Sequence, residues 1–303
     1  MPQKQAIVWF RSDLRLADNP ALDHACSRGY SILPIYIYSP EEEQQWALGG
    51  ASRWWLHHSL HSLDSSLRAR GSKLLIFQGR TLCTLLSLVE KTGATALFWN
   101  RRYEPDIITR DKNIKEVMRS KAMEVETFNG SLLHEPWTIQ NKSQRPFQVF
   151  TPFWKNALEI THPSPPLPAP DQIPLPSDLP DSISLYSLAL LPTLPWDQGF
   201  YTRWKPGEIG AKKNITDFIQ MAFTRYTEGR NLPFEKGTSR LSPHLHFGEI
   251  SPRQIWHSFA TQFPTTESWK SSSYISEIGW REFAYHLLYH FPQTPVKALR
   301  QAF

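Results

Sequence analysis

The sequence predicts an α/β domain built on a five-stranded, doubly wound parallel sheet, followed by a linker and an all-α segment. Short apolar runs alternate with helical patterns through residues 1–130, as is typical of parallel strands joined by crossover helices. Eight prolines then fall between Pro163 and Pro180, and after Pro206 the apolar residues recur at helical spacing. We therefore expect domains at 1–130 and 206–303, joined by an extended linker at 131–205.

The first domain opens with a strand at 5–10, where a continuous apolar run is typical of a strand buried on both faces. Further strands are expected at 32–38, 73–77, 94–99 and 124–128, and helices at 20–28, 51–70, 81–92 and 105–121. Ligands of such sheets bind at the carboxyl ends of the strands, where the turn at 11–15 lies. The chain carries no Gly-x-Gly-x-x-Gly, so a dinucleotide-binding fingerprint is not indicated.

The residues after Pro206 predict three helices. The helix at 210–226 carries its apolar residues in one stripe, formed by Ile215, Phe218, Ile219 and Ala222. A second helix begins at Ser251-Pro252 and runs to about 259, because Ser caps free amides and Pro suits the first turn. The third covers 273–290, and we expect the aromatic segment 147–154 to pack on these helices.

The charge of the chain favours a polyanionic partner. The formal net charge is +5, and the window 203–257 holds nine Lys or Arg against five Asp or Glu, which is +4 of that total. A basic balance of this kind suits DNA, although a solvated basic surface would explain it as well.

Two cysteines, Cys26 and Cys83, form no disulfide framework, which suits a reducing cytoplasm. We expect each to be a small buried side chain on a helix. The sequence shows no signal segment and no apolar run of membrane-spanning length, so we expect a soluble cytoplasmic protein. His244, His246 and His257 lack metal-ligand spacing, and we predict no metal.

The run Gly237–Pro243 places polar groups ahead of a predicted helix start. Ser242 before Pro243 predicts a capped first turn, so Thr238, Ser239 and Arg240 would lie just before the helix N-terminus. Free amides, hydroxyls and a guanidinium there would suit a phosphate or pyrophosphate. On these residues alone, an ordinary capped helix with a surface arginine is the alternative.

A second run, Glu277–Phe283, lies in the last predicted helix. Glu277, Trp280, Arg281 and Ala284 fall at i, i+3, i+4 and i+7 and so share one face. That face suits a wet cavity in which a planar group stacks on Trp280 and is hydrogen-bonded by Glu277. A buried tryptophan beside a salt bridge is the alternative.

Several runs, in the same order and spacing, carry a resemblance to a known family. They are Arg11–Arg15, Asn100–Pro105, Leu133–Ile139, Tyr226–Pro233, Glu235–Ser242, Gly248–Gln254 and Trp280–Phe283. Together they resemble the DNA photolyase/cryptochrome family over essentially the whole chain. The bacterial class I cyclobutane pyrimidine dimer photolyases are the most similar branch.

The resemblance implies reduced FAD in the helical segment and an antenna chromophore, either a folate or a deazaflavin, in the N-terminal domain. Blue light would excite the flavin, directly or through the antenna, and an electron would pass to a cyclobutane pyrimidine dimer in DNA. The dimer would split and the electron would return to the flavin. Asn100 and Glu104 match positions that line the antenna pocket in folate-type members. Plain loop structure is the alternative for both residues.

Matched residue by residue, the FAD phosphates and ribityl chain would be held by Tyr226, Thr238, Ser239, Arg240, Leu241 and Ser242. Tyr274 would also contact FAD, although the family frequently has Trp at this position, and Arg281 would lie against the flavin. Glu277 would hydrogen-bond the dimer, Trp280 would stack on the flipped pyrimidines, and Arg230 would contact DNA phosphate.

Family members continue for many more helices beyond Trp280–Phe283, whereas this sequence stops at Phe303. The resemblance therefore predicts an incomplete all-α FAD-binding domain, weak FAD retention and no repair by this chain alone. Apolar side chains that later helices would cover should be partly exposed, namely Phe283, Leu287, Leu288 and Phe291. We expect a monomer, or a chain that needs the missing helices.

Two other readings of the sequence remain open. A cryptochrome-like light sensor would share the fold and FAD but not the repair, and the presence of Glu277 with Trp280 favours repair. A non-enzymatic nucleotide-binding α/β protein would carry no yellow chromophore and would not prefer damaged DNA.

Overall fold

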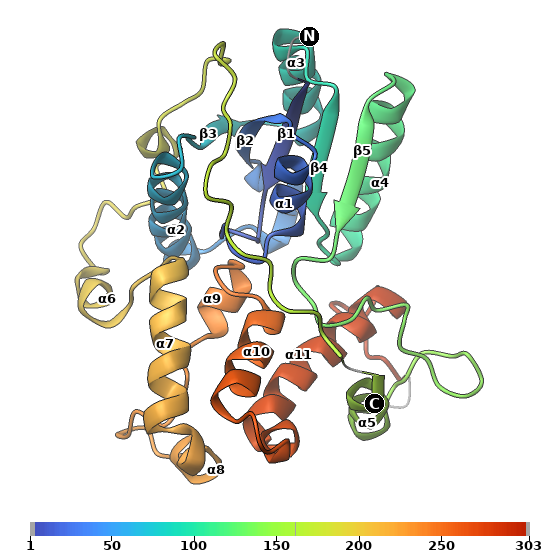
Figure 1. The fold of residues 1–303 in the computed structure, drawn as a ribbon, viewed down its shortest axis with the longest axis vertical. Helices are drawn as coiled ribbons and strands as arrows, with labels where there is room; N and C mark the ends of the chain where they lie inside the picture. Colours follow the sequence, from blue (N-terminus) through green and yellow to red (C-terminus); the bar gives the residue numbers. More distant parts are fainter. Residues whose placement is uncertain (1–3, 161, 301–303) are drawn as a thin grey trace.

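The computed structural model describes residues 4–160 and 162–300. Its sheet consists of β1 (Gln5–Phe10), β2 (Ser31–Tyr38), β3 (Leu75–Gln78), β4 (Ala96–Asn100) and β5 (Glu124–Phe128). All pairings are parallel and the strand order is β3-β2-β1-β4-β5, with Ala6 paired to both Ile32 and Ala96. The predicted doubly wound sheet is confirmed (Figure 1).

Helices cover both faces of the sheet. Ala6, Val8 and Phe10 of β1 pack with α1 (Pro20–Ser27) and α2 (Gly50–Arg68). Ile7 and Trp9 point to the other face and pack with α3 (Thr81–Thr92) and α4 (Pro105–Ser120). This alternation explains the unbroken apolar run of the strand, because a strand between two helical layers has no solvent face.

The helical segment lies beyond the carboxyl ends of the strands (Figure 1). It consists of α7 (Glu208–Met221), α8 (Tyr226–Gly229), α9 (Ser242–His246), α10 (Pro252–Gln262) and α11 (Ser273–His290). Helix α10 starts after Ser251, as the sequence predicted. A capping box, which was not predicted, completes this start: the Ser251 side chain accepts from the Gln254 amide, and the Gln254 side chain accepts from the Ser251 amide. The helix predicted at 210–226 instead ends at Met221, and a short 3-10 turn, Phe223–Arg225, leads into α8.

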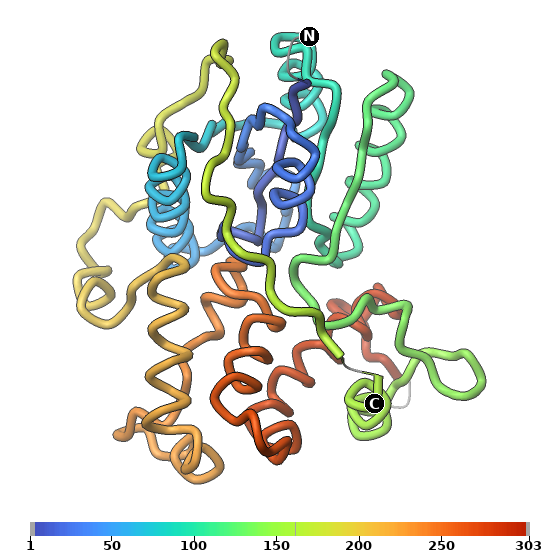
Figure 2. Tube along the Cα trace, in the orientation of Figure 1, coloured from blue at the N-terminus to red at the C-terminus, as the bar shows by residue number. Residues whose placement is uncertain are grey.

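The segment expected to be an extended linker contains two helices, α5 (Phe150–Ile160) and α6 (Gln198–Arg203). Phe153 and Trp154 of α5 are buried in the core of the helical segment, where the aromatic run was expected to pack. The Pro-rich stretch then runs back along the sheet domain (Figure 2). Pro174 accepts from the Ile32 amide at 2.7 Å, and Ile183 bridges to Ile76 beside the edge strand β3.

The turn after β1 joins the parts of the molecule. Arg15 is 1% exposed and donates to the carbonyls of Gly130 at 2.6 Å and Gly248 at 2.9 Å. Asp18 is fully buried and pairs with Arg253 at 2.8 Å. The carboxylate of Glu208 accepts from the Leu16 amide at 3.0 Å. The sheet domain and the helical segment are thus fixed to each other by buried polar contacts.

Two sequence expectations about burial are wrong. Cys83 is exposed, because it lies on the outer side of α3, whereas Cys26 is partly buried. Phe283 is only 5% exposed, because it packs against Phe150 and Phe153 of α5. Leu287, Leu288 and Phe291 are partly exposed, as expected. None of the helices in the described ranges is long and apolar enough to span a bilayer.

Replacing Gly248 by Ala should destabilise the contact between the two parts. Gly248 has φ +67°, and a Cβ there would lie 2.1 Å from the Ser12 carbonyl oxygen. We expect a left-handed backbone penalty of roughly 1–2 kcal/mol and a further overpacking cost of roughly 1–3 kcal/mol, measured by thermal and denaturant unfolding. Gly29→Ala is the matched control, because Gly29 has φ +71° but a Cβ there meets nothing within 4 Å. Equal losses for both variants would contradict this account of the contact.

Candidate functional site

Four residues singled out by the sequence form one continuous group. Arg230, just after α8, forms an ion pair with Glu277 of α11. The Arg230 guanidinium lies 5.6 Å from the ring centroid of Tyr226, and the Tyr226 ring lies 5.2 Å from that of Tyr274. The hydrogen bond between Arg230 and Glu277 raises the pKa of Arg230. The residue predicted to contact DNA therefore lies between predicted cofactor and dimer residues.

Tyr274 is buried with an unpaired hydroxyl. Its side chain is 4% exposed, and within the described residues its hydroxyl has no hydrogen-bond partner. Burial raises the pKa of Tyr274, and the nearby Ser239 side chain offsets part of that effect. A buried unpaired hydroxyl costs free energy unless a partner satisfies it. The neighbouring Ser239 side chain is one candidate for that partner.

The loop before α9 differs from the sequence expectation at Ser242. The helix begins at Ser242 itself, Leu241 is the N-cap residue, and no side chain caps the first turn. Leu241 is 1% exposed and packs in the core of the helical segment, so only its backbone can face a ligand. Thr238 and Ser242 are exposed, and Arg240 has φ +54° with its guanidinium 5.7 Å from the Trp204 ring centroid.

Two glycines hold this loop against α8. A Cβ on Gly237 would lie 2.3 Å from the carbonyl oxygen of Gly229. The close approach brings the loop beside the end of the helix that carries Tyr226. Hydroxyls, a guanidinium and a buried phenol thus border one region, a donor set that suits phosphate oxygens.

Trp280 is stacked on a residue that the sequence did not single out. Its ring centroid is 3.8 Å from that of Phe150, with 10° between the planes. The indole nevertheless remains 49% exposed. Phe150 lies within the aromatic segment expected to pack on the helices, and that was the only sequence signal for it.

Arg281 does not share the environment of Glu277. Its guanidinium donates to the Ser131 carbonyl at 2.8 Å and lies 4.9 Å from the ring centroid of Tyr285. The predicted common face of α11 is therefore divided: Glu277, Trp280 and Ala284 face outward, whereas Arg281 turns toward the sheet domain. The cause is the loop after β5, which supplies a carbonyl acceptor that periodicity does not reveal.

A cavity of about 600 Å³ lies between the carboxyl ends of the strands and α11. Its lining includes Trp9, Tyr36, Glu104, Arg281 and Tyr285. Volume and composition are those of a small-molecule pocket, with aromatic walls and a few polar groups. Its position agrees with the general location of ligands in doubly wound sheets.

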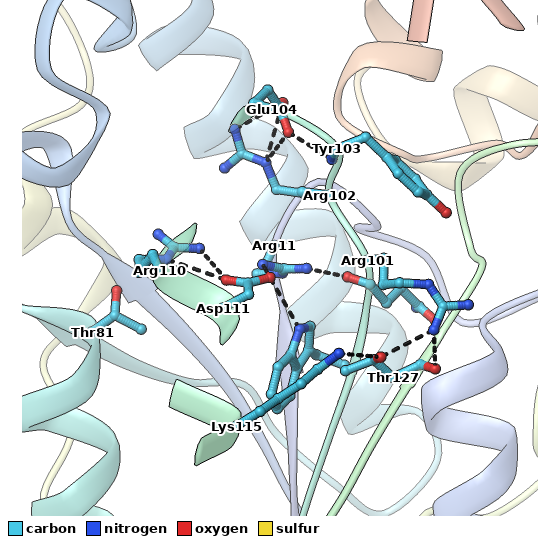
Figure 3. A network of polar contacts seen from close by, with 12 residues as sticks. Arg11, Thr81, Arg101, Arg102, Tyr103, Glu104, Arg110, Asp111, Lys115 and Thr127 are labelled. Atoms are coloured by element: carbon cyan, nitrogen blue, oxygen red, sulfur yellow. Dashed lines mark hydrogen bonds and ion pairs between the residues drawn. The ribbon is translucent and has the colours of Figure 1, made fainter. Parts of the chain in front are cut away.

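A fixed polar network lies on the sheet side of this cavity (Figure 3). Asp111 accepts from Arg11 at 2.6 Å and from the Trp99 indole at 3.2 Å. Nearby, Thr127 accepts from Lys115 at 2.9 Å and from Arg101 at 3.0 Å. Arg11 and Arg101, which line the cavity, are thus held in fixed orientations by hydrogen bonds within the protein.

The two predicted antenna residues have different surroundings. Asn100 is 2% exposed and donates to Asp13 at 2.6 Å and to Asn19 at 2.8 Å, and it is not among the residues that line the cavity. Glu104 does line the cavity and pairs with Arg102 at 3.0 Å. Burial favours a higher pKa for Glu104, but Arg102 outweighs it and lowers the pKa.

One group of potential metal ligands lies elsewhere. His24, Glu124 and Glu126 bring ligand atoms within 4.8 Å of one another beside β5. Glu124 already accepts from Tyr30 at 2.7 Å and from Arg28 at 3.4 Å. The group is thus explained as a hydrogen-bonded ion cluster at the sheet edge.

Comparison with known proteins identifies the family to which this fold belongs. The family model described as DNA photolyase matches residues 6–171. The chain therefore belongs to the DNA photolyase family.

Individual relatives agree with this assignment. The chain is 43% identical over 298 residues to the deoxyribodipyrimidine photo-lyase of Agrobacterium fabrum, covering 98% of this chain and 62% of that protein. It is 35% identical over 309 residues to cryptochrome-2 of Arabidopsis thaliana, covering 98% of this chain and 50% of that protein. The chain thus spans about half to two thirds of the length of these relatives.

A solved structure of similar sequence has the same fold. The class III photolyase from Agrobacterium tumefaciens aligns with a TM-score of 0.93 at 43% identity, covering all of this chain and 62% of the other. That structure is described as class III, whereas the motifs led us to expect similarity to class I.

Glu282, in the same motif as Trp280, should make stability depend on pH. It is 3% exposed, accepts from the Leu133 amide at 2.9 Å, and burial raises its pKa to about 7. Because the folded-state pKa exceeds the unfolded value, its contribution to stability is present at acid pH and is lost as pH rises toward 7.

Glu282→Gln should remove the loss of folding stability that Glu282 causes as the pH rises toward 7. Relative to the original chain, the variant should gain stability on moving from pH 5 to pH 8, by about 1.4 kcal/mol for each pH unit of this interval that lies below the folded-state pKa of Glu282. Denaturant unfolding of both proteins at the two pH values measures the effect. A difference in stability that is the same at pH 5 and pH 8 would rule out titration of Glu282.

Proposed function

We propose that this chain acts in light-dependent repair of cyclobutane pyrimidine dimers in DNA, with reduced FAD as the electron donor. The observation that carries the proposal is the position of Arg230, which pairs with Glu277 and lies over the ring of Tyr226. A DNA-binding group, a dimer-binding group and a cofactor-binding group are contiguous, as transfer of an electron from cofactor to dimer requires. Bound FAD would supply that electron.

The residues around the 237–242 loop suit the phosphate side of FAD. The exposed Thr238 and Ser242 offer hydroxyls, and Arg240 offers a guanidinium. Tyr274 adds a buried hydroxyl beside the Ser239 side chain. Charge-assisted hydrogen bonds of this kind hold a pyrophosphate without any metal ligand. Arg281 faces the cavity instead, so in this chain its role would be to support that cavity.

DNA would be held from the outward face of α11. Arg230 would bind a phosphate, and its engagement there would free the Glu277 carboxylate for the dimer. The exposed indole of Trp280 would stack on a flipped pyrimidine. The positive charge concentrated in 203–257 supports attraction of the polyanion.

The interdomain cavity would hold the second chromophore, a folate or a deazaflavin. Its volume of about 600 Å³ suits a planar ligand of that size. Trp9, Tyr36 and Tyr285 offer aromatic contacts, and Glu104 offers a carboxylate to ring nitrogens. Asn100 would act indirectly, by fixing the turn after β1 that borders the cavity.

The test uses purified residues 1–303 supplied with FAD. They are assayed alone and together with a second polypeptide that supplies the helices by which the photolyase relatives exceed this chain, which covers 62% of the Agrobacterium fabrum relative. For residues 1–303 alone we expect weak flavin retention and no repair. With the second polypeptide we expect flavin binding, a preference for oligonucleotides that contain a dimer, and loss of dimers under blue light but not in the dark. Flavin binding with no preference for dimers would favour a cryptochrome-like sensor. Neither flavin binding nor dimer preference would favour a non-enzymatic nucleotide-binding protein.

Arg230→Ala should weaken DNA binding by similar factors for damaged and intact duplexes, because a phosphate contact carries no information on the base. The affinity of the variant should also fall less steeply with salt, by about one unit in the log–log slope. Fluorescence anisotropy over a salt series measures both effects. Arg225→Ala is the control, since Arg225 is exposed but pairs with Glu235 at 3.7 Å, away from Glu277. Equal losses for the two variants would show a general charge effect only.

Glu277→Gln should leave binding of dimer DNA largely intact and lower the repair yield per absorbed photon. Glutamine keeps a hydrogen bond but cannot supply the negative charge of the carboxylate or donate a proton from a carboxylic acid. Repair at constant photon dose, at saturating DNA, measures the yield. An unchanged yield would remove Glu277 from the mechanism.

A further inference from the structure

The stack of Phe150 on Trp280 is the closest aromatic pair among the described residues, with ring centroids 3.8 Å apart and planes 10° from parallel. Phe150 is the first residue of α5, and Trp280 lies in the middle of α11. The pair therefore joins two helices that are more than one hundred residues apart in sequence.

Phe150 is itself held in place by its neighbours. The Trp154 ring, one turn further along α5, is nearly parallel to that of Phe150, with 12° between the planes and 6.4 Å between centroids. Phe283 of α11 contacts Phe150 edge-on at 5.9 Å. Gly279 permits this approach, because a Cβ there would lie 2.5 Å from the ring of Trp154.

One face of the Trp280 indole is thus covered, while 49% of the side chain remains accessible. Glu277, one turn earlier on α11, is also partly exposed. Without Phe150, the indole would be free to rotate onto the apolar surface of α5. A side chain that must be ordered before it binds lowers affinity by the cost of that ordering.

We propose that Phe150 is a positioning residue for dimer recognition: it covers one face of Trp280, fixes the orientation of the indole and leaves a single face for a flipped pyrimidine. The inference rests on the proposed role of Trp280. It adds a specificity residue from α5 to a site otherwise built from α8 and α11.

Binding in the dark tests the inference without light or chemistry. The measured quantity is the ratio of affinities for dimer-containing and intact oligonucleotides, using the full chain. Phe150→Leu should lower this ratio roughly 2- to 10-fold, the range set by the strength of an aromatic pair. Phe150→Tyr and Phe150→Trp should keep it, because each restores a stacked ring. Phe147→Leu is the matched control, since the Phe147 ring packs edge-on against Phe153 at 6.2 Å.

A double-mutant cycle separates this inference from the proposed function. If Phe150 acts through Trp280, adding Phe150→Leu to Trp280→Ala should cause no further loss of the ratio. Loss in Trp280→Ala with no loss in Phe150→Leu would overturn the inference and leave the proposed function standing. No loss in Trp280→Ala would overturn both. If the Phe150→Leu variant does not fold, Phe150→Met replaces it. A folded Phe150→Tyr variant with a lowered affinity ratio for dimer-containing over intact oligonucleotides would also overturn the inference.

Discussion

The buried guanidinium of Arg15 is the interaction on which the arrangement of the molecule depends. It lies at the carboxyl end of the sheet and donates to the Asp18 carbonyl of its own turn at 2.6 Å. It also donates to the carbonyls of Gly130 at 2.6 Å and Gly248 at 2.9 Å, in two distant segments. A charge taken out of water is tolerated only when acceptors replace its hydration. The three carbonyls must therefore hold their positions, and this fixes the helical segment against the turn after β1.

A second buried group extends this constraint to the 237–242 loop. Glu249 is fully buried and accepts from Trp55 at 3.0 Å and Ser59 at 2.6 Å on α2, and it also pairs with His244 of α9. The helix that follows the 237–242 loop is therefore positioned by the sheet domain. Losing one partner of a buried charge of this kind typically costs about 3–5 kcal/mol. Placement of the loop is thus coupled to folding of the whole chain.

Periodicity predicted the elements well but could not predict their contacts. The bounds of α3, β5 and α11 agree with the sequence expectation, because apolar spacing and local caps determine them. Helix α5 was missed because its single apolar face is short and lies beside a Pro-rich stretch. Periodicity placed Arg281 on the same face as Glu277, but its guanidinium donates to the Ser131 carbonyl. The resemblance placed Asn100 at the antenna pocket, but its amide donates to Asp13. Both acceptors come from segments distant in the sequence. Motif spacing identifies such residues, but tertiary hydrogen bonds decide where they point.

Helix α11 places the residues of one short run, Glu277–Phe283, in two regions, the outward face of the helix and the interdomain cavity. Its outward side carries Glu277 and Trp280, while Arg281 and Tyr285 form a wall of the interdomain cavity. The buried Glu282 holds the chain after β5 against the same helix by accepting from the Leu133 amide at 2.9 Å. Because both sets of side chains project from one continuous helix, the cavity and the outward face keep a fixed separation and orientation. In the proposed function, transfer of excitation energy or of an electron between two bound groups would depend on that geometry, which the Arg281 and Glu282 hydrogen bonds to the backbone after β5 help to fix.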